Sequence, residues 1–157
     1  MDSFELAKST KGWGNIKLIL HERMKRTNKE PYINKIESLN SPNLHLSLTP
    51  VNYNKLDKLI SSADIGLVVY KPKNYGISWA NMGKSSGKIA DYLALGKPII
   101  CSNLPDFKHI VEKYNCGYVF ESFDEIPSLI QQIRLNYDTI SKNAIKCFKD
   151  EYDFSKY

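Results

Sequence analysis

Six small or basic residues lie near the middle of the chain, just before a short helical pattern, and their types suit the binding of a phosphate group. They are Gly83, Lys84, Ser85, Ser86, Gly87 and Lys88. Glycine lets a ligand approach the backbone closely, serine hydroxyls donate hydrogen bonds, and lysine offsets negative charge. The free N–H groups and the positive dipole end of a following helix add to this attraction. The segment therefore predicts a phosphate-binding corner.

The corner does not fit the two commonest nucleotide-binding motifs. A Walker loop needs glycine where this chain has Met82, and serine or threonine where it has Ile89. The segment also lacks a G-x-G-x-x-G turn. A purely structural interpretation stays open beside the phosphate site, in which Ser85 or Ser86 caps the helix and Lys88 is a solvated surface residue.

The residues after the corner predict a helix over about 88–95, followed by a buried strand. Ile89, Ala90, Leu93 and Ala94 recur at helical spacing. Gly96 suits the left-handed end of a helix. Pro98 then opens the apolar strand 99–101, at a strand position where a missing N–H matters least.

The remainder of the chain alternates between strand and helix patterns. We predict strands at 16–21, 44–48, 65–70 and 118–120, and helices at 2–9, from Pro31, from Asn52, at 105–114, at 125–135 and at 137–148. This alternation predicts an α/β fold, a doubly wound, Rossmann-like parallel sheet with helices on both faces. The connection 71–84 is longer than a usual strand-to-helix loop, and loops of that length are often functional.

Composition and charge narrow the class of protein. The 157 residues correspond to one globular domain, and the apolar runs are too short to span a bilayer. The net charge is +5, with basic residues concentrated at Lys17, Arg23, Lys25, Arg26 and Lys29. An anionic ligand, a membrane face and an ordinary solvated surface all remain open as explanations. No aromatic residues alternate with the basic ones, so we expect no nucleic-acid partner.

The three cysteines and three histidines show no pairing or metal-ligand spacing. Cys101, Cys116 and Cys147 are odd in number, which favours reduced thiols and a cytoplasmic protein. His21, His45 and His109 are interpreted as strand-end or surface residues, and we expect no bound metal.

The segment 86–100 (SGKIADYLALGKPII) resembles the donor-site segment of retaining GT-B glycosyltransferases of group 1, the family-4-like enzymes. Members carry the pattern S-x-K-x-x-E-Y-L-A-x-G-x-P-V-I. Further matches follow the family's order: Ala63-Asp64-Ile65, Pro105 to Val111, Asn115 to Val119 and Asp124 to Ile130. The resemblance covers roughly residues 12–150.

The resemblance implies a role for several residues. Residues 83–88 would hold the donor pyrophosphate, and Asp91, where most members have glutamate, would bind the ribose hydroxyls. Val51, Asn52 and Tyr53 lie where the family's base-contacting loop falls. Gly83 replaces a second acid that faces the donor sugar in other members. An ordinary surface ion pair between Asp91 and Lys88 is the alternative. No catalytic residue can be assigned, and no cofactor or metal is expected.

By the same resemblance, residues 1–157 form one donor-binding domain, the C-terminal half of a GT-B enzyme. It would transfer a sugar from a nucleoside diphosphate sugar to a glycan or lipid-linked acceptor, as in cytoplasmic polysaccharide biosynthesis, with a peripheral contact at the inner face of the membrane left open. The family's first, central strand is missing, so we expect an N-terminally truncated chain that is inactive alone. Its acceptor-binding N-terminal domain would be supplied in cis or in trans.

Three alternatives to this assignment remain. The chain could be a non-catalytic nucleotide-sugar-binding module or a subunit of a split glycosyltransferase. A flavodoxin-like signalling domain ranks last, because the early strands do not end in a cluster of acids.

Overall fold

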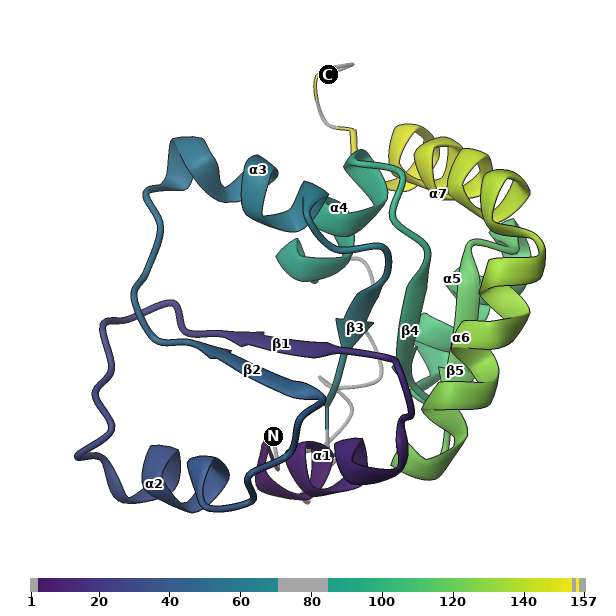
Figure 1. The fold of residues 1–157 in the computed structure, drawn as a ribbon. Helices are drawn as coiled ribbons and strands as arrows, with labels where there is room; N and C mark the ends of the chain where they lie inside the picture. Colours follow the sequence, from purple (N-terminus) through teal and green to yellow (C-terminus); the bar gives the residue numbers. More distant parts are fainter. Residues whose placement is uncertain (1–2, 71–84, 154, 156–157) are drawn as a thin grey trace. The chain divides into compact units, whose positions relative to one another are not determined.

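The computed structural model describes residues 3–70, 85–153 and 155 (Figure 1). The chain divides into two compact units, Met1–Leu56 and Asp57–Tyr157, which we call unit 1 and unit 2.

Unit 1 is built on two parallel strands, with Leu18 of the first opposite Leu44 of the second. In chain order its elements are α1 (Ser3–Ser9), η1 (Thr10–Gly12), β1 (Leu18–His21), α2 (Pro31–Glu37), β2 (Leu44–Ser47) and η2 (Tyr53–Lys55). The two helices pack against each other (Figure 1), and they bury Leu6 and Ala7 of α1 with Ile33 and Ile36 of α2. Apolar residues at helical spacing therefore hold this unit together.

A buried polar contact joins the start of unit 1 to the turn before β2. The Thr10 hydroxyl lies 2.8 Å from that of Ser41, and the Asn43 side-chain amide donates to the Thr10 carbonyl at 2.9 Å. Both Thr10 and Asn43 are buried. Because these hydrogen bonds replace those that Thr10 and Asn43 would make to water, the burial of the two residues is not strongly destabilising.

Unit 2 is a three-stranded parallel sheet in the order β3-β4-β5, with helices around it. In chain order its elements are α3 (Leu56–Ser61), β3 (Gly66–Val68), α4 (Gly87–Ala94), β4 (Ile99–Ser102), α5 (Pro105–Tyr114), β5 (Gly117–Phe120), η4 (Phe123–Glu125), α6 (Ile126–Leu135) and α7 (Tyr137–Glu151). All four residues of the central strand β4 are buried. Continuous burial is typical of a parallel strand that is covered on both faces.

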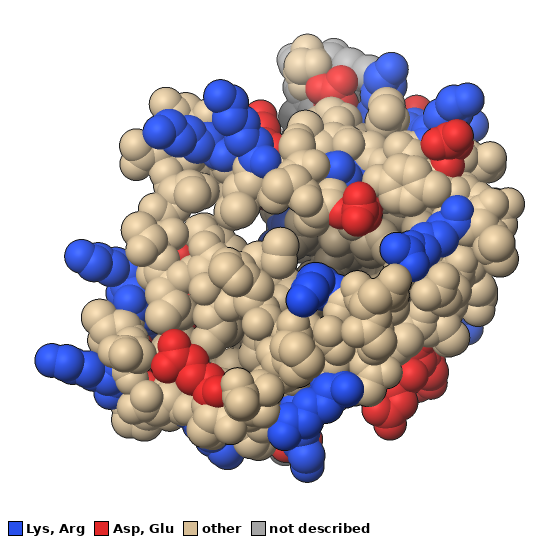
Figure 2. Space-filling model, viewed as in Figure 1, with Lys and Arg blue, Asp and Glu red and all other residues tan. Residues whose placement is uncertain are grey.

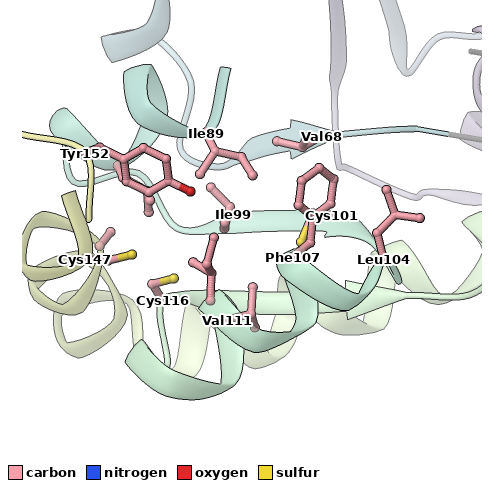
Figure 3. Close-up of a cluster of buried hydrophobic side chains, with 13 residues drawn as sticks. Val68, Ile89, Ile99, Cys101, Leu104, Phe107, Val111, Cys116, Cys147 and Tyr152 are labelled. Carbon is pink, nitrogen blue, oxygen red and sulfur yellow. The ribbon is translucent and has the colours of Figure 1, made fainter. Parts of the chain in front are cut away.

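The core of unit 2 lies between β4, α4, α5 and α7 (Figure 3). It consists of Val68, Ile89, Leu93, Ile99, Cys101, Leu104, Phe107, Ile110, Val111, Cys116, Ala144, Cys147 and Tyr152. The three cysteines are free and buried, and burial raises the pKa of Cys101. Figure 3 shows the sulfur atoms of Cys116 and Cys147 on neighbouring side chains, with Cys147 extending from α7. These thiols act as small apolar core residues.

Two glycines of unit 2 allow close contacts that any side chain would block. A Cβ atom at Gly117 would overlap the carbonyl group of Ile99 on the neighbouring strand. A Cβ atom at Gly66 would overlap the ring of Tyr92, which lies on α4. The first contact sets the approach of β5 to β4, and the second sets the approach of α4 to β3.

Helix α7 ties down the loops that lead into β3 and β4. The Tyr137 hydroxyl donates to the Asp64 carbonyl at 2.9 Å, and the Ser141 hydroxyl donates to the Gly96 carbonyl at 2.7 Å. Both loops lie at the amino-terminal edge of the sheet, because Asp64 precedes β3 and Gly96 precedes β4. This edge is therefore fastened by side chains from the last helix.

The predicted α/β fold class is confirmed, with parallel strands in two sheets flanked by helices. The doubly wound order 3-2-1-4-5-6 would place β2 and β1 on one side of its central strand and β3, β4 and β5 on the other. Within unit 1 the parallel pair β1-β2, and within unit 2 the order β3-β4-β5, each agree with part of that order. The strands before residue 100 are shorter than predicted, since β1 begins at Leu18 and β3 ends at Val68.

Helix α5 ends at Tyr114, as predicted, and its C-cap Asn115 has the left-handed φ of 50°. One predicted helix start was wrong in detail. Asn52 precedes a 3-10 turn and not directly an α-helix, and its side chain makes no capping hydrogen bond. The predicted stop at Gly96 is confirmed by its φ of +65°. The predicted loop 71–84 lies outside the described residues.

Candidate functional site

The start of α4 carries the predicted phosphate-binding residues that the structure describes. Ser86 is the N-cap, and its hydroxyl oxygen accepts the N–H of Ile89 at 3.5 Å. Ser86 is buried, whereas Ser85 and Gly87 are exposed. The Ser86 hydroxyl is therefore directed toward its own helix, and the capping role left open by the sequence belongs to Ser86.

Two backbone donors at this helix end have no acceptor among the described residues. They are the N–H groups of Gly87 and Lys88, because the capping bonds go only to Ile89 and Ala90. Among the described residues, no heavy atom outside the adjoining backbone would lie within 4 Å of a Cβ atom at Gly87, so these residues leave the space beside it open. Free N–H groups, the positive end of the helix dipole and open space together suit an anion.

Lys88 lies beside an aromatic residue that sequence analysis did not identify. The Lys88 ammonium is 5.4 Å from the centre of the Tyr70 ring. Tyr70 is held by its backbone N–H, which donates to the Ser102 hydroxyl at 2.9 Å, and by its ring, 5.6 Å from that of Phe107. Tyr70 follows β3 and Ser102 ends β4, so Lys88 reaches the carboxyl edge of the sheet. Parallel α/β sheets bind their ligands at that edge.

Asp91 lies one helical turn after Gly87 and is half-buried. Partial desolvation raises the pKa of its carboxyl group, and the negative charge of Asp57 raises it further. No ion pair with Lys88 is present among the described residues, so the simple surface pair considered from the sequence does not form. The carboxylate is left able to accept hydrogen bonds from a ligand.

The core and the last helix fix the position of α4. Ile89 and Leu93 are fully buried on its inner face, and Gly96 terminates it in the left-handed conformation. The whole helix also packs against α7. The residues on its outer face are therefore presented by a rigid support.

The structure shows no contact between the other predicted site residues and this corner. Gly83 and Lys84 lie outside the described residues. Val51, Asn52 and Tyr53 belong to unit 1, after β2, and all three are exposed. Their base-contacting role stays a prediction.

Two kinds of feature are absent from the residues that the structure describes. No group of three or more His, Cys, Asp or Glu side chains is placed to hold a metal ion. No helix there has the length and apolar character needed to cross a membrane.

A known protein family matches most of the chain. The family model described as "Glucosyltransferase 3-like, C-terminal domain" matches residues 20–150. The match includes β3, β4 and α4, and so the whole described part of the corner. A search of curated proteins found no match for the chain.

Proposed function

Because this chain belongs to the family of glucosyltransferase 3-like C-terminal domains, we propose that it is the donor-binding half of a retaining GT-B glycosyltransferase of group 1. It binds a nucleoside diphosphate sugar, from which the complete enzyme transfers the sugar to a glycan or lipid-linked acceptor. A separate acceptor-binding domain, in the same chain or another, completes the active site. The observation that carries the proposal is the open N-terminus of α4, with its two free N–H groups and Lys88.

The pyrophosphate is the part of the donor that this corner fits best. Its oxygens accept hydrogen bonds from the backbone N–H groups of Gly87 and Lys88, which no described residue occupies. The Lys88 ammonium, which lies over the Tyr70 ring in the free protein, turns toward the bound diphosphate in this proposal. There it offsets the charge that grows on the leaving diphosphate as the bond to the sugar breaks.

In this arrangement Asp91 binds the ribose. Two ribose hydroxyls donate to its carboxylate, one helical turn from the pyrophosphate. The carboxylate is disfavoured in the free protein, because it is partly desolvated and lies near the charge of Asp57. Hydrogen bonds from the hydroxyls stabilise the ionised form, so ribose binding offsets the desolvation and the repulsion that disfavour the carboxylate in the free protein.

The decisive experiment is titration calorimetry of UDP, GDP and ADP with wild type and Lys88→Ala. We expect one of these nucleotides to bind, and the variant to bind it roughly 10- to 100-fold more weakly, as for the loss of one charged hydrogen bond. Lys142→Ala is the matched control, because Lys142 is exposed on α7 in the same unit. Equal affinity of Lys88→Ala and wild type would remove the pyrophosphate role. Absence of nucleotide binding by a folded sample would favour a scaffold without donor-binding function.

The variant Asp91→Asn tests the ribose contact, because it should weaken nucleotide binding without lowering the stability of the fold. For an aspartate whose folded-state pKa is raised, stability falls as the pH rises from the unfolded pKa through the folded one. The ionised Asp91 therefore opposes folding at neutral pH, and its replacement by asparagine should keep or slightly raise the melting temperature. The same variant should bind nucleoside diphosphates more weakly and inorganic pyrophosphate as wild type does. An equal loss for both ligands would mean that Asp91 acts on the conformation of the corner instead.

A further inference from the structure

The connection between β1 and α2, residues 22–30, lies in the more basic part of the chain. Residues 1–56 contain nine Lys or Arg and five Asp or Glu, so they carry +4 of the net charge of +5. We call residues 22–30 the basic loop. Figure 2 shows Lys and Arg side chains projecting from the margin where Figure 1 places this connection.

The basic loop is braced from within by a network of paired charges. The Arg26 guanidinium lies between two carboxylates, 3.0 Å from that of Glu30 and 3.6 Å from that of Glu22. The Tyr32 hydroxyl donates to Glu22 at 2.6 Å. The Arg26 backbone N–H donates to the Leu48 carbonyl at 3.0 Å and so ties the loop to the segment after β2. The loop therefore has a defined shape, and the charge of Arg26 is paired with those of Glu22 and Glu30.

The outward-facing residues of the basic loop have no such partners. Arg23, Lys25 and Lys29 are exposed and make no ion pair or hydrogen bond with any described residue. Met24, between the first two of these cations, is 59% exposed. Three uncompensated cations and an exposed apolar side chain on one short loop are the combination that binds an anionic lipid surface, where charge attracts and the apolar group inserts.

We propose that the basic loop docks this protein on an anionic lipid bilayer. Arg23, Lys25 and Lys29 contact lipid phosphates, and Met24 enters the headgroup region. A soluble polyanion would use the three cations but gain little from Met24. A single-stranded nucleic acid would call for aromatic residues among the cations, and the basic loop contains none. The proposal is independent of donor binding, which involves a different unit of the chain.

The test is co-sedimentation of the 157-residue chain with lipid vesicles at low salt. We expect binding to vesicles of equal phosphatidylcholine and phosphatidylglycerol, little binding to phosphatidylcholine alone, and weakening as salt is raised. Each cation near such a surface contributes roughly fivefold in partitioning, so R23Q/K25Q/K29Q should bind about 100-fold more weakly. R134Q/K142Q/K146Q removes the same charge from exposed positions of unit 2 and should bind as wild type does.

Met24→Ser tests whether the partner is a bilayer. The variant keeps every charge and should lose roughly five- to tenfold in vesicle binding, while its binding to heparin stays at the wild-type level. The proposal is overturned if wild type ignores anionic vesicles, if the two triple variants bind equally, or if Met24→Ser binds vesicles as wild type does. The last outcome would make the basic loop a general polyanion site. Circular dichroism of each variant confirms that a loss does not come from unfolding.

Discussion

Gly117→Ala is expected to prevent unit 2 from folding stably. The new Cβ atom would overlap the carbonyl group of Ile99, which lies directly opposite on the central strand β4. Backbone cannot move aside as a flexible side chain can, so β5 must shift away and lose hydrogen bonds. We expect a loss of about 3 kcal/mol or more, a large part of the stability of an ordinary domain. Urea denaturation followed by far-ultraviolet circular dichroism measures it.

The matched control is Gly87→Ala, in the same unit. In the part of the chain that the structure describes, a Cβ atom at Gly87 would meet no heavy atom within 4 Å beyond the adjoining backbone. The residue also begins a helix, where alanine is favoured over glycine. This variant should unfold at the same urea concentration as wild type or a higher one. If Gly117→Ala did the same, the close approach of β5 to β4 would not exist in solution.

Gly66→Ala is expected to destabilise unit 2 by about 2–3 kcal/mol, the cost of overfilling a packed contact. Its Cβ atom would overlap both the ring and the Cβ atom of Tyr92, so rotation of the ring alone gives no relief. Helix α4 must move away from β3, and the Lys88 and Asp91 side chains move with it. Nucleotide affinity should therefore fall together with the free energy of unfolding.

A double-mutant cycle with Tyr92→Ala isolates that contact. Tyr92→Ala alone costs stability because the ring packs against the core. Once the ring is gone, however, Gly66→Ala has room for its methyl group. The double variant should then be about as stable as Tyr92→Ala, with a coupling energy of about 1–3 kcal/mol. Purely additive losses would show that the ring is not what excludes a side chain at Gly66.

Local chemistry explains why the segment 86–100 was predicted well. Its serine cap, helical spacing, terminal glycine and strand-opening proline each act within a few residues of one another. The structure accordingly has a helix from Gly87 to Ala94, a left-handed Gly96 and a strand from Ile99. The role of Gly117 could not be predicted, for the opposite reason. Its small size serves a contact with a different strand.

The residues that surround Lys88 could not be predicted from local sequence patterns. Tyr70 and Ser102 are 32 residues apart, and their hydrogen bond exists only because β3 and β4 are neighbours in the sheet. The sequence did contain a signal, since each residue stands at the end of a predicted apolar strand. The division into two sheets is likewise a matter of strand pairing, which periodicity within a single strand does not reveal.

The fastening of the amino-terminal edge of the sheet by Tyr137 and Ser141 has a consequence for the evolution of this family. Helix α7 anchors one edge of unit 2, while Lys88 and Tyr70 lie at the other. Substitutions at the carboxyl edge leave those anchoring hydrogen bonds intact. With donor binding at the carboxyl edge, as proposed above, loops there could diversify toward new donors on an unchanged framework, which is how one fold comes to serve many substrates.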